Sequence, residues 1–228
     1  MFQAKIFLFL IFLHLPKVFS LYLGNPAAAS FPDRGMFIAT NYALGISVAY
    51  AKDHVFKKKF HANPSLELVR NANHAVALFN WNQRIEFYGA VGEESIGFKN
   101  QTAQTLKEKA IDWSIGGSAV LMEWGKICVC AAGAYLQTYP PAGSHSNLYQ
   151  EWEIGLSLCK RIDYFSFYAL GGFSKAYYRY RNDEFLKSAH PFLLSLGASF
   201  FTKKAFSMNG ELRFFGETAL GFDFAFKF

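Results

Sequence analysis

The 228-residue chain is poor in proline and cysteine, with seven and three respectively, and it contains no low-complexity tract. This composition argues against a disordered chain, and the length suits one sizeable domain. The sequence also lacks a nucleophile elbow, a P-loop, a zincin motif and a dinucleotide-binding fingerprint. The common sequence signatures of enzymes are therefore missing.

Long apolar runs are missing too, except at the start. Beyond the first segment, no stretch is apolar enough, for long enough, to span a bilayer as a helix. Residues 1–20 contain an early lysine, the apolar run Ile6–Leu13, and Ser20 where a signal peptidase needs a small residue. They predict a cleaved export signal and a mature chain that begins at Leu21. A membrane anchor is the alternative, but it needs about twenty apolar residues and Pro16 interrupts this run.

Concentrated positive charge is also absent. The formal net charge is +6, and removing Lys5 and Lys17 with the expected signal leaves a mildly basic mature chain. The basic residues are dispersed, apart from Lys57, Lys58 and Lys59. Solvated loops explain this distribution better than nucleic-acid binding does, so no nucleic-acid partner is expected.

The sequence does have a strong alternation of apolar and polar residues, with 52% hydrophobic residues and 26 Phe. In residues 220–228, every second side chain is Leu or Phe, and residues 151–159 alternate in the same way. A soluble antiparallel sandwich would also alternate. Apolar faces rich in Phe, Leu and Trp, opposite faces of Gly, Ser and charges, favour lipid outside and a crowded or watery interior. The prediction is an all-β fold, a transmembrane antiparallel up-and-down β-barrel over residues 21–228.

About ten strands are expected, which places both chain ends in the periplasm and the protein in the outer membrane. Tight turns alternate with longer connections, and the long loops 93–110 and 177–190 are expected to face outward. The terminal Phe228 resembles the signal that the outer-membrane insertion machinery recognises. The expected strands are 37–51, 66–79, 84–92, 111–122, 127–138, 149–159, 163–176, 191–201, 205–215 and 218–228.

The alternation assigns a set of charged side chains to the lumen. They are tolerated there because they pair or meet water, whereas on the lipid face they cost about 2–4 kcal/mol at mid-depth. Small inward residues such as Ser114, Gly116 and Gly197 leave room for water, although a barrel of about eight strands is filled by side chains. An open pore and a filled interior are therefore both compatible with the sequence. The predicted lumen-lining residues are Arg84, Glu86, Asp112, Glu151, Glu153, Glu211, Arg213, Asp223 and Lys227.

The three cysteines lie on two consecutive expected strands. Cys128 and Cys130 face the same way, and a loop centred near residues 143 and 144 places Cys128 opposite Cys159. A disulfide between Cys128 and Cys159 is predicted for an exported chain, with Cys130 free or available for an intermolecular bond. Buried, unbonded thiols are the alternative. Because a metal site usually needs four ligands and no His is near in sequence, neither a metal nor a cofactor is expected.

Five stretches of the mature chain carry a family resemblance. They are LYLGNPAAAS, SVAYAKDHVF, DWSIGGSAVLMEWG, GAYLQTYP and LYQEWEIGLSLCKRIDYFSFYALGGFSKA, of which EWEIGLSL is the most specific. In this order they resemble the chlamydial major outer membrane protein family of porins. The chain resembles a shortened member, because it is much shorter than those porins and has few cysteines. The resemblance implies passive diffusion of solutes and support of a disulfide-linked envelope.

The predicted function is a narrow, weakly selective pore for small solutes. A structural or adhesive envelope barrel with a blocked lumen is the alternative. An outer-membrane lipid-modifying enzyme would rest on His145 between Ser144 and Ser146, but no third group orients this histidine, so no enzyme is expected. The expected partners are outer-membrane lipid and lipopolysaccharide, the insertion machinery, and further chains in a homo-oligomer or linked through cysteine.

Overall fold

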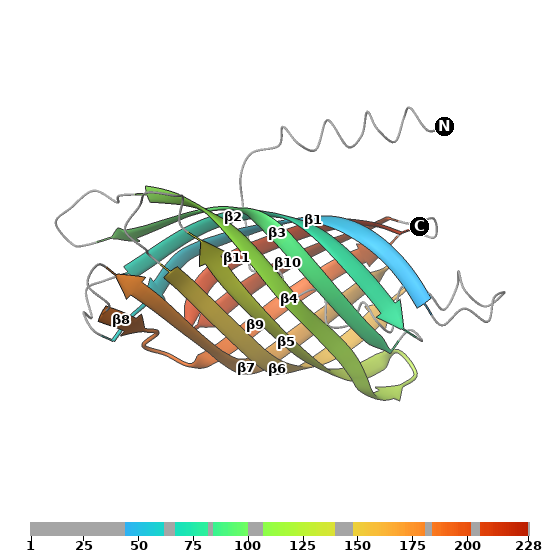
Figure 1. Ribbon diagram of the computed structural model, residues 1–228. Coiled ribbons are helices and arrows are strands. Elements are labelled where there is room, and N and C mark those ends of the chain that lie inside the picture. Colours follow the sequence, from blue (N-terminus) through green and yellow to red (C-terminus); the bar gives the residue numbers. More distant parts are fainter. Residues whose placement is uncertain are drawn as a thin grey trace, which may run out of the picture.

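The computed structural model describes residues 44–61, 67–81, 84–99, 107–139, 148–180, 184–201 and 206–227 (Figure 1). No helix of these residues is long and apolar enough to cross a membrane. The described residues form strands β1 (Leu44–Lys59), β2 (Glu67–Trp81), β3 (Ile85–Lys99), β4 (Lys107–Trp124), β5 (Ile127–Tyr139), β6 (Leu148–Ile162), β7 (Phe165–Tyr180), β8 (Glu184–Lys187), β9 (Phe192–Phe201), β10 (Phe206–Phe215) and β11 (Glu217–Lys227).

Ten long strands form one closed antiparallel sheet, which confirms the predicted up-and-down β-barrel. Around the barrel the order is β1 to β7, then β9, β10 and β11, and β11 pairs with β1 to close the ring. The closing register runs from Ser47 opposite Lys227 to Lys58 opposite Glu217. Closure leaves neither β1 nor β11 with an unpaired edge along this seam.

β1 and β3 are longer than the sequence predicts. The strand expected at 37–51 starts, within the described residues, at Leu44 and continues to Lys59, and β3 continues through Glu93 to Lys99. Polar residues near these positions suggested loops. The extra segments remain strands because their inward carboxylates, Asp53 and Glu94, meet arginines inside the barrel.

Inward and outward faces alternate along the strands. In β6, Glu151, Glu153 and Ser157 are buried, while Trp152, Ile154 and Leu156 are exposed. In β2, Val76 and Leu78 point inward, whereas Ala75, Ala77 and Phe79 are exposed. The interior has two groups of buried apolar residues, which together span most of the strands.

The outer surface carries a broad apolar belt. On β6 this belt runs from Trp152 to Leu158 and ends at exposed Lys160, and on β7 it ends at exposed Lys175. An apolar band about 25 Å tall, bounded by polar residues, is the surface of a barrel that sits in a bilayer. The belt includes Phe87, Val91, Ile115, Leu121, Trp152, Ile154, Leu156, Leu158, Phe167, Phe173, Leu196 and Leu212.

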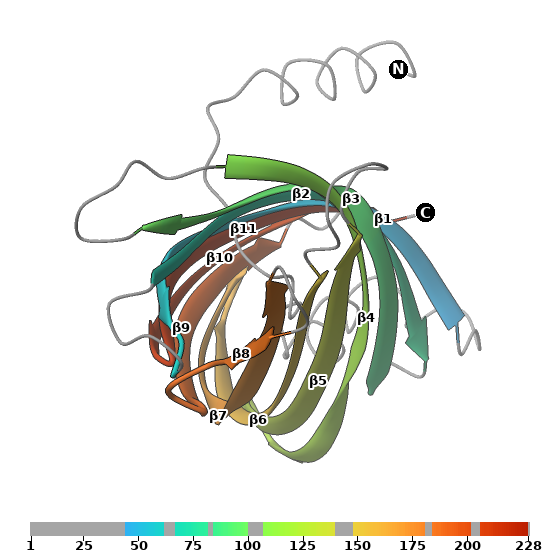
Figure 2. The same cartoon turned by 60° about the vertical axis from the view of Figure 1, so that its left-hand side comes forward.

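The two ends of the barrel differ in strand number. The turn end carries the turns at 125–126 and 163–164, and the loop end carries the connection after Lys59 and the short strand β8 (Figures 1 and 2). At the loop end β8 pairs with the last residues of β7, and Ser188 bridges to Phe60 beside β1. The ring there is β1 to β7 plus β8, which makes eight strands instead of ten. β8 lies inside the loop predicted for 177–190, where no strand was expected.

Candidate functional site inside the barrel

Most of the predicted lumen residues lie on the inner face. The buried ones are Glu86, Asp112, Glu151, Glu153, Glu211, Arg213 and Asp223. Arg84 differs from the prediction, because it lies in the turn before β3 with a side chain 58% exposed, 3.7 Å from Glu123. The side chains of Lys227 and Phe228, and the whole of His145, lie outside the described residues.

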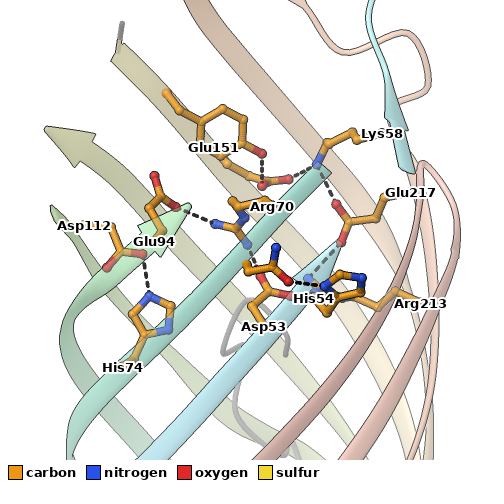
Figure 3. A network of polar contacts seen from close by, with 12 residues as sticks. Asp53, His54, Lys58, Arg70, His74, Glu94, Asp112, Glu151, Arg213 and Glu217 are labelled. Atoms are coloured by element: carbon orange, nitrogen blue, oxygen red, sulfur yellow. Dashed lines mark hydrogen bonds and ion pairs between the residues drawn. The ribbon is translucent and has the colours of Figure 1, made fainter. Parts of the chain in front are cut away.

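Lys58 of β1 crosses the lumen. Its Nζ pairs with Glu151 of β6 and donates to Ser174 Oγ at 3.1 Å and to Glu217 Oε2 at 3.0 Å (Figure 3). At this level Glu151 lies opposite Ala176 of β7, Ala176 bonds to Ser188, and Ser188 bridges to Phe60 beside β1. The side chains of Lys58 and Glu151 are both 0% exposed. This buried contact therefore joins β1 to β6, which are not neighbours in the sheet, through the interior of the loop end.

Two arginines extend this contact into a continuous charged layer. Arg70 pairs with Asp53 and lies 3.6 Å from Glu94 Oε2. Arg213 Nη2 donates to the other oxygen of Asp53 at 2.6 Å, and its Nη1 lies 3.0 Å from Glu217 Oε1. Asp53 thus joins the two arginines, and Glu217 joins Arg213 to Lys58 (Figure 3). The charged layer consists of Asp53, Lys58, Arg70, Glu94, Glu151, Arg213 and Glu217.

Tyrosine rings, rather than water, occupy the space beside the inward glycines. A Cβ added to Gly116 would lie 2.5 Å from the Tyr88 ring, and one added to Gly197 would lie 2.1 Å from Cζ of Tyr168. Both tyrosines are buried, and the Tyr168 hydroxyl donates to Glu211 Oε2 at 2.7 Å. The small residues that suggested a watery bore therefore make room for rings from neighbouring strands.

The interior is acidic overall. Among the described residues, its only buried Lys and Arg side chains are Lys58, Arg70 and Arg213, and His74 adds a contact of 2.6 Å to Asp112. Neither carboxylate oxygen of Glu153 has a hydrogen-bond partner within the described part of the chain. An ion that entered this interior would meet mainly carboxylates. The buried carboxylates are Asp53, Glu86, Glu94, Asp112, Glu151, Glu153, Glu211, Glu217 and Asp223.

The three cysteines meet at the inner face near the turn end. Cys128 lies directly opposite Cys159, in the register that the sequence predicts. All three thiols are buried and none of them is in a disulfide, so the predicted Cys128–Cys159 bond is not formed in this structure. The Sγ atoms of Cys128 and Cys130 are 3.5 Å apart, and all three sulfurs lie within 4.8 Å of one another.

The sequence prediction includes only two of the seven residues of the charged layer, Glu151 and Arg213. Asp53 and Lys58 were assigned to a loop, and Arg70, Glu94 and Glu217 were not recognised as inward charges. Asp53 could be found from the alternation of inward and outward side chains, because the alternation that turns Ala51 inward also turns Asp53 inward. A β-bulge between Val55 and Lys58 shifts this alternation, so counting every second residue does not predict that Lys58 faces inward.

Comparisons with known proteins find distant similarity to solved structures alone. No family model and no curated protein matches the chain. An outer membrane channel from Pseudomonas putida F1 shares 12% identity over 86% of this chain and 99% of its own, with a TM-score of 0.48. The β domain of the Bordetella autotransporter BrkA shares 9% over 82% and 99%, with a TM-score of 0.46. The transport unit of the Escherichia coli autotransporter AIDA-I shares 12% over 91% and 97%, with a TM-score of 0.38.

The class of protein is defined by the chain's own geometry, which is a closed antiparallel barrel with an apolar outer surface and a charged, buried interior. The compared proteins include a channel and parts of two autotransporters, and none of them exceeds 12% identity. Such similarity does not assign an activity to this chain.

Proposed function

We propose that the protein is an outer-membrane barrel with a sealed interior that serves as a structural element of the envelope. The apolar belt supports the membrane location, because its exposed Phe, Leu, Ile and Trp side chains lose their contact with water only in lipid. In this arrangement the loop end faces outward and the turn end faces the periplasm. The motif resemblance supports a place beside the chlamydial major outer membrane porins as a shortened relative.

The observation that carries the sealed interior is the buried contact between Lys58 and Glu151, which joins β1 to β6 inside the loop end. The eight-strand ring at the loop end adds to it, because a barrel of about eight strands is just wide enough for side chains to fill. A layer of Phe60, Leu68, Leu136 and Tyr149, each 0% exposed, lies at the same end. These features favour the filled barrel over the narrow solute pore.

Single-channel recording in planar bilayers tests this proposal. The wild-type barrel is expected to give no steady conductance steps. Replacing both partners of this contact, Lys58→Ser with Glu151→Ser, is expected to produce steps that carry cations in preference to anions, because the remaining carboxylates still line the path. Wild-type steps as large as those of the double variant would establish the pore instead.

The matched control is the double variant Lys57→Ser with Glu67→Ser. These two residues form an ion pair of 2.6 Å between β1 and β2, but both side chains reach solvent. The control is expected to remain silent. Heat-modifiable migration in gels is measured for both double variants, so that an open path is not confused with a misfolded barrel.

A further inference from the structure

The cysteine cluster at the turn end is not used by the charged layer. Cys128 and Cys130 are two residues apart on β5 and share the inner face, and Cys159 of β6 lies opposite Cys128. A disulfide would use two of these sulfurs and leave the third beside them. The convergence of all three therefore calls for a ligand that contacts three sulfurs at once.

We propose that Cys128, Cys130 and Cys159 form a three-thiolate site for one soft cation of the Zn²⁺ or Cu⁺ type. Metal–thiolate bonds of about 2.3 Å around one ion place the sulfurs about 3.8–4.0 Å apart. The observed 3.5 Å between two sulfurs, and the limit of 4.8 Å for all three, bracket this spacing. Soft thiolate ligands without oxygen or nitrogen partners select such ions over Mg²⁺ or Ca²⁺.

The surroundings of the site suit a thiolate ligand. Ser157 is buried, and its Oγ lies 3.4 Å from Cys159 Sγ and 3.5 Å from the carbonyl oxygen of Cys130. When the thiols are ionised, this hydroxyl can donate to sulfur and hold the ligand in place. Binding of a divalent ion releases three thiol protons and oxidises nothing.

The C-x-C pair on β5 offers only two ligands by itself. The hairpin register brings the third thiol to the pair, and all three cysteines are 0% exposed. We infer that the ion is captured while β5 and β6 pair, before the interior is closed. Such an ion stabilises the folded barrel, because the unfolded chain does not hold the three sulfurs together.

Refolding the full chain into detergent under reducing conditions, with and without Cd²⁺ as the probe, tests the proposal. One Cd²⁺ per chain is expected, with an ultraviolet thiolate-to-metal absorption band and a higher unfolding midpoint, and Zn²⁺ is expected to compete. Cys130→Ser keeps the opposed pair and should weaken binding at least tenfold. Ala132→Ser is the matched control on the same face of β5, and it should bind as the wild type does.

Three results would overturn the proposal. The first is that the reduced wild type binds no Cd²⁺. The second is that Cys130→Ser binds it as tightly as the wild type, because the third sulfur would then have no role. The third is that the chain refolded without reductant forms a Cys128–Cys159 disulfide while the reduced chain shows no absorption band, which would make the cluster a site of cross-linking.

Discussion

The loop end and the turn end of this barrel are filled in different ways. At the level where β10 and β11 end and the ring narrows, Lys58, Arg70 and Arg213 reach carboxylates on other strands. Toward the turn end the ring has ten strands, and Tyr88 and Tyr168 pack against glycines while thiols and alanines line the wall. Charged side chains from several strands therefore meet where the ring narrows, whereas tyrosine rings fill space in the wider part.

This difference predicts where the stability resides. A charge in the loop-end layer is held by several partners, so its removal leaves other buried charges without compensation. A tyrosine ring that packs against a glycine is held by close packing, so a larger residue at the glycine position disturbs it. The predictions below test the two ends, and the belt around them, in decreasing order of expected effect.

The largest effect is expected for Lys58→Met in the charged layer. The substitution leaves Glu151 without its buried ion-pair partner and leaves Glu217 with Arg213 alone, and it should lower the free energy of unfolding by about 3–5 kcal/mol. Urea unfolding of the refolded barrel in lipid vesicles measures this loss. Lys57→Met is the matched control, since this neighbouring lysine forms an exposed pair with Glu67 worth about 0–1 kcal/mol. Equal losses in both variants would remove the special role of the layer.

The second effect concerns how deep a residue of the apolar belt lies in the bilayer. Leu156→Arg places a charge in the middle of the lipid face and should cost about 2–4 kcal/mol, whereas Ile162→Arg, on the same face of β6 at the turn end, should cost about 0–1 kcal/mol. The two side chains are similarly exposed, at 57% and 47%. Folding yield into vesicles and urea midpoints report the difference. If the two positions tolerate arginine equally, the belt does not face lipid.

A third substitution tests the ring packing toward the turn end. Gly116→Ala would push a methyl group into the Tyr88 ring and should cost about 1–3 kcal/mol. The matched control is Gly89→Ala on the neighbouring strand, because a Cβ there has no neighbour within 4 Å. Urea unfolding should separate the two variants. A harmless Gly116→Ala would mean that water, and not the tyrosine, fills this space.

The smallest effect is expected at β8. The backbone N–H of Ala176 donates to Ser188 Oγ at 3.1 Å, and Ser188→Ala removes this bond at a cost of about 1 kcal/mol. Hydrogen exchange should accelerate at Ala176, while Ala169, further along β7 and paired with β9, should keep its protection. Unchanged exchange at Ala176 would mean that β8 does not hold the narrowed ring closed.

Much of the wall could be predicted from the sequence, because local alternation determines which side chains face inward. The alternation of faces and the hairpin length predict the number of long strands, the faces of β6 and β11, and the pairing of Cys128 with Cys159. The alternation of faces depends only on neighbouring residues, so it can be read from a single sequence.

The interior network could not be predicted in the same way. Lys58 and Glu151 are 93 residues apart, and Asp53 and Arg213 are 160 apart, so nothing local marks them as partners. A charged residue such as Asp53 resembles a loop residue until its arginines are placed. β8 has only four residues, and it forms because the ends of β1 and β7 lie near each other once the barrel has closed.

The seam between the first and last strands has a consequence for assembly. Lys58 and Asp53 of β1 find Glu217 of β11 and Arg213 of β10 only when the two ends of the sheet have met. A sheet still open in the bilayer would lack the contacts of Lys58 with Glu217 and of Asp53 with Arg213, and the loss of these contacts in lipid would cost energy. We therefore expect open intermediates to be rare in lipid, so that the last step of insertion is all-or-none. The charged layer is therefore complete only in a fully closed barrel.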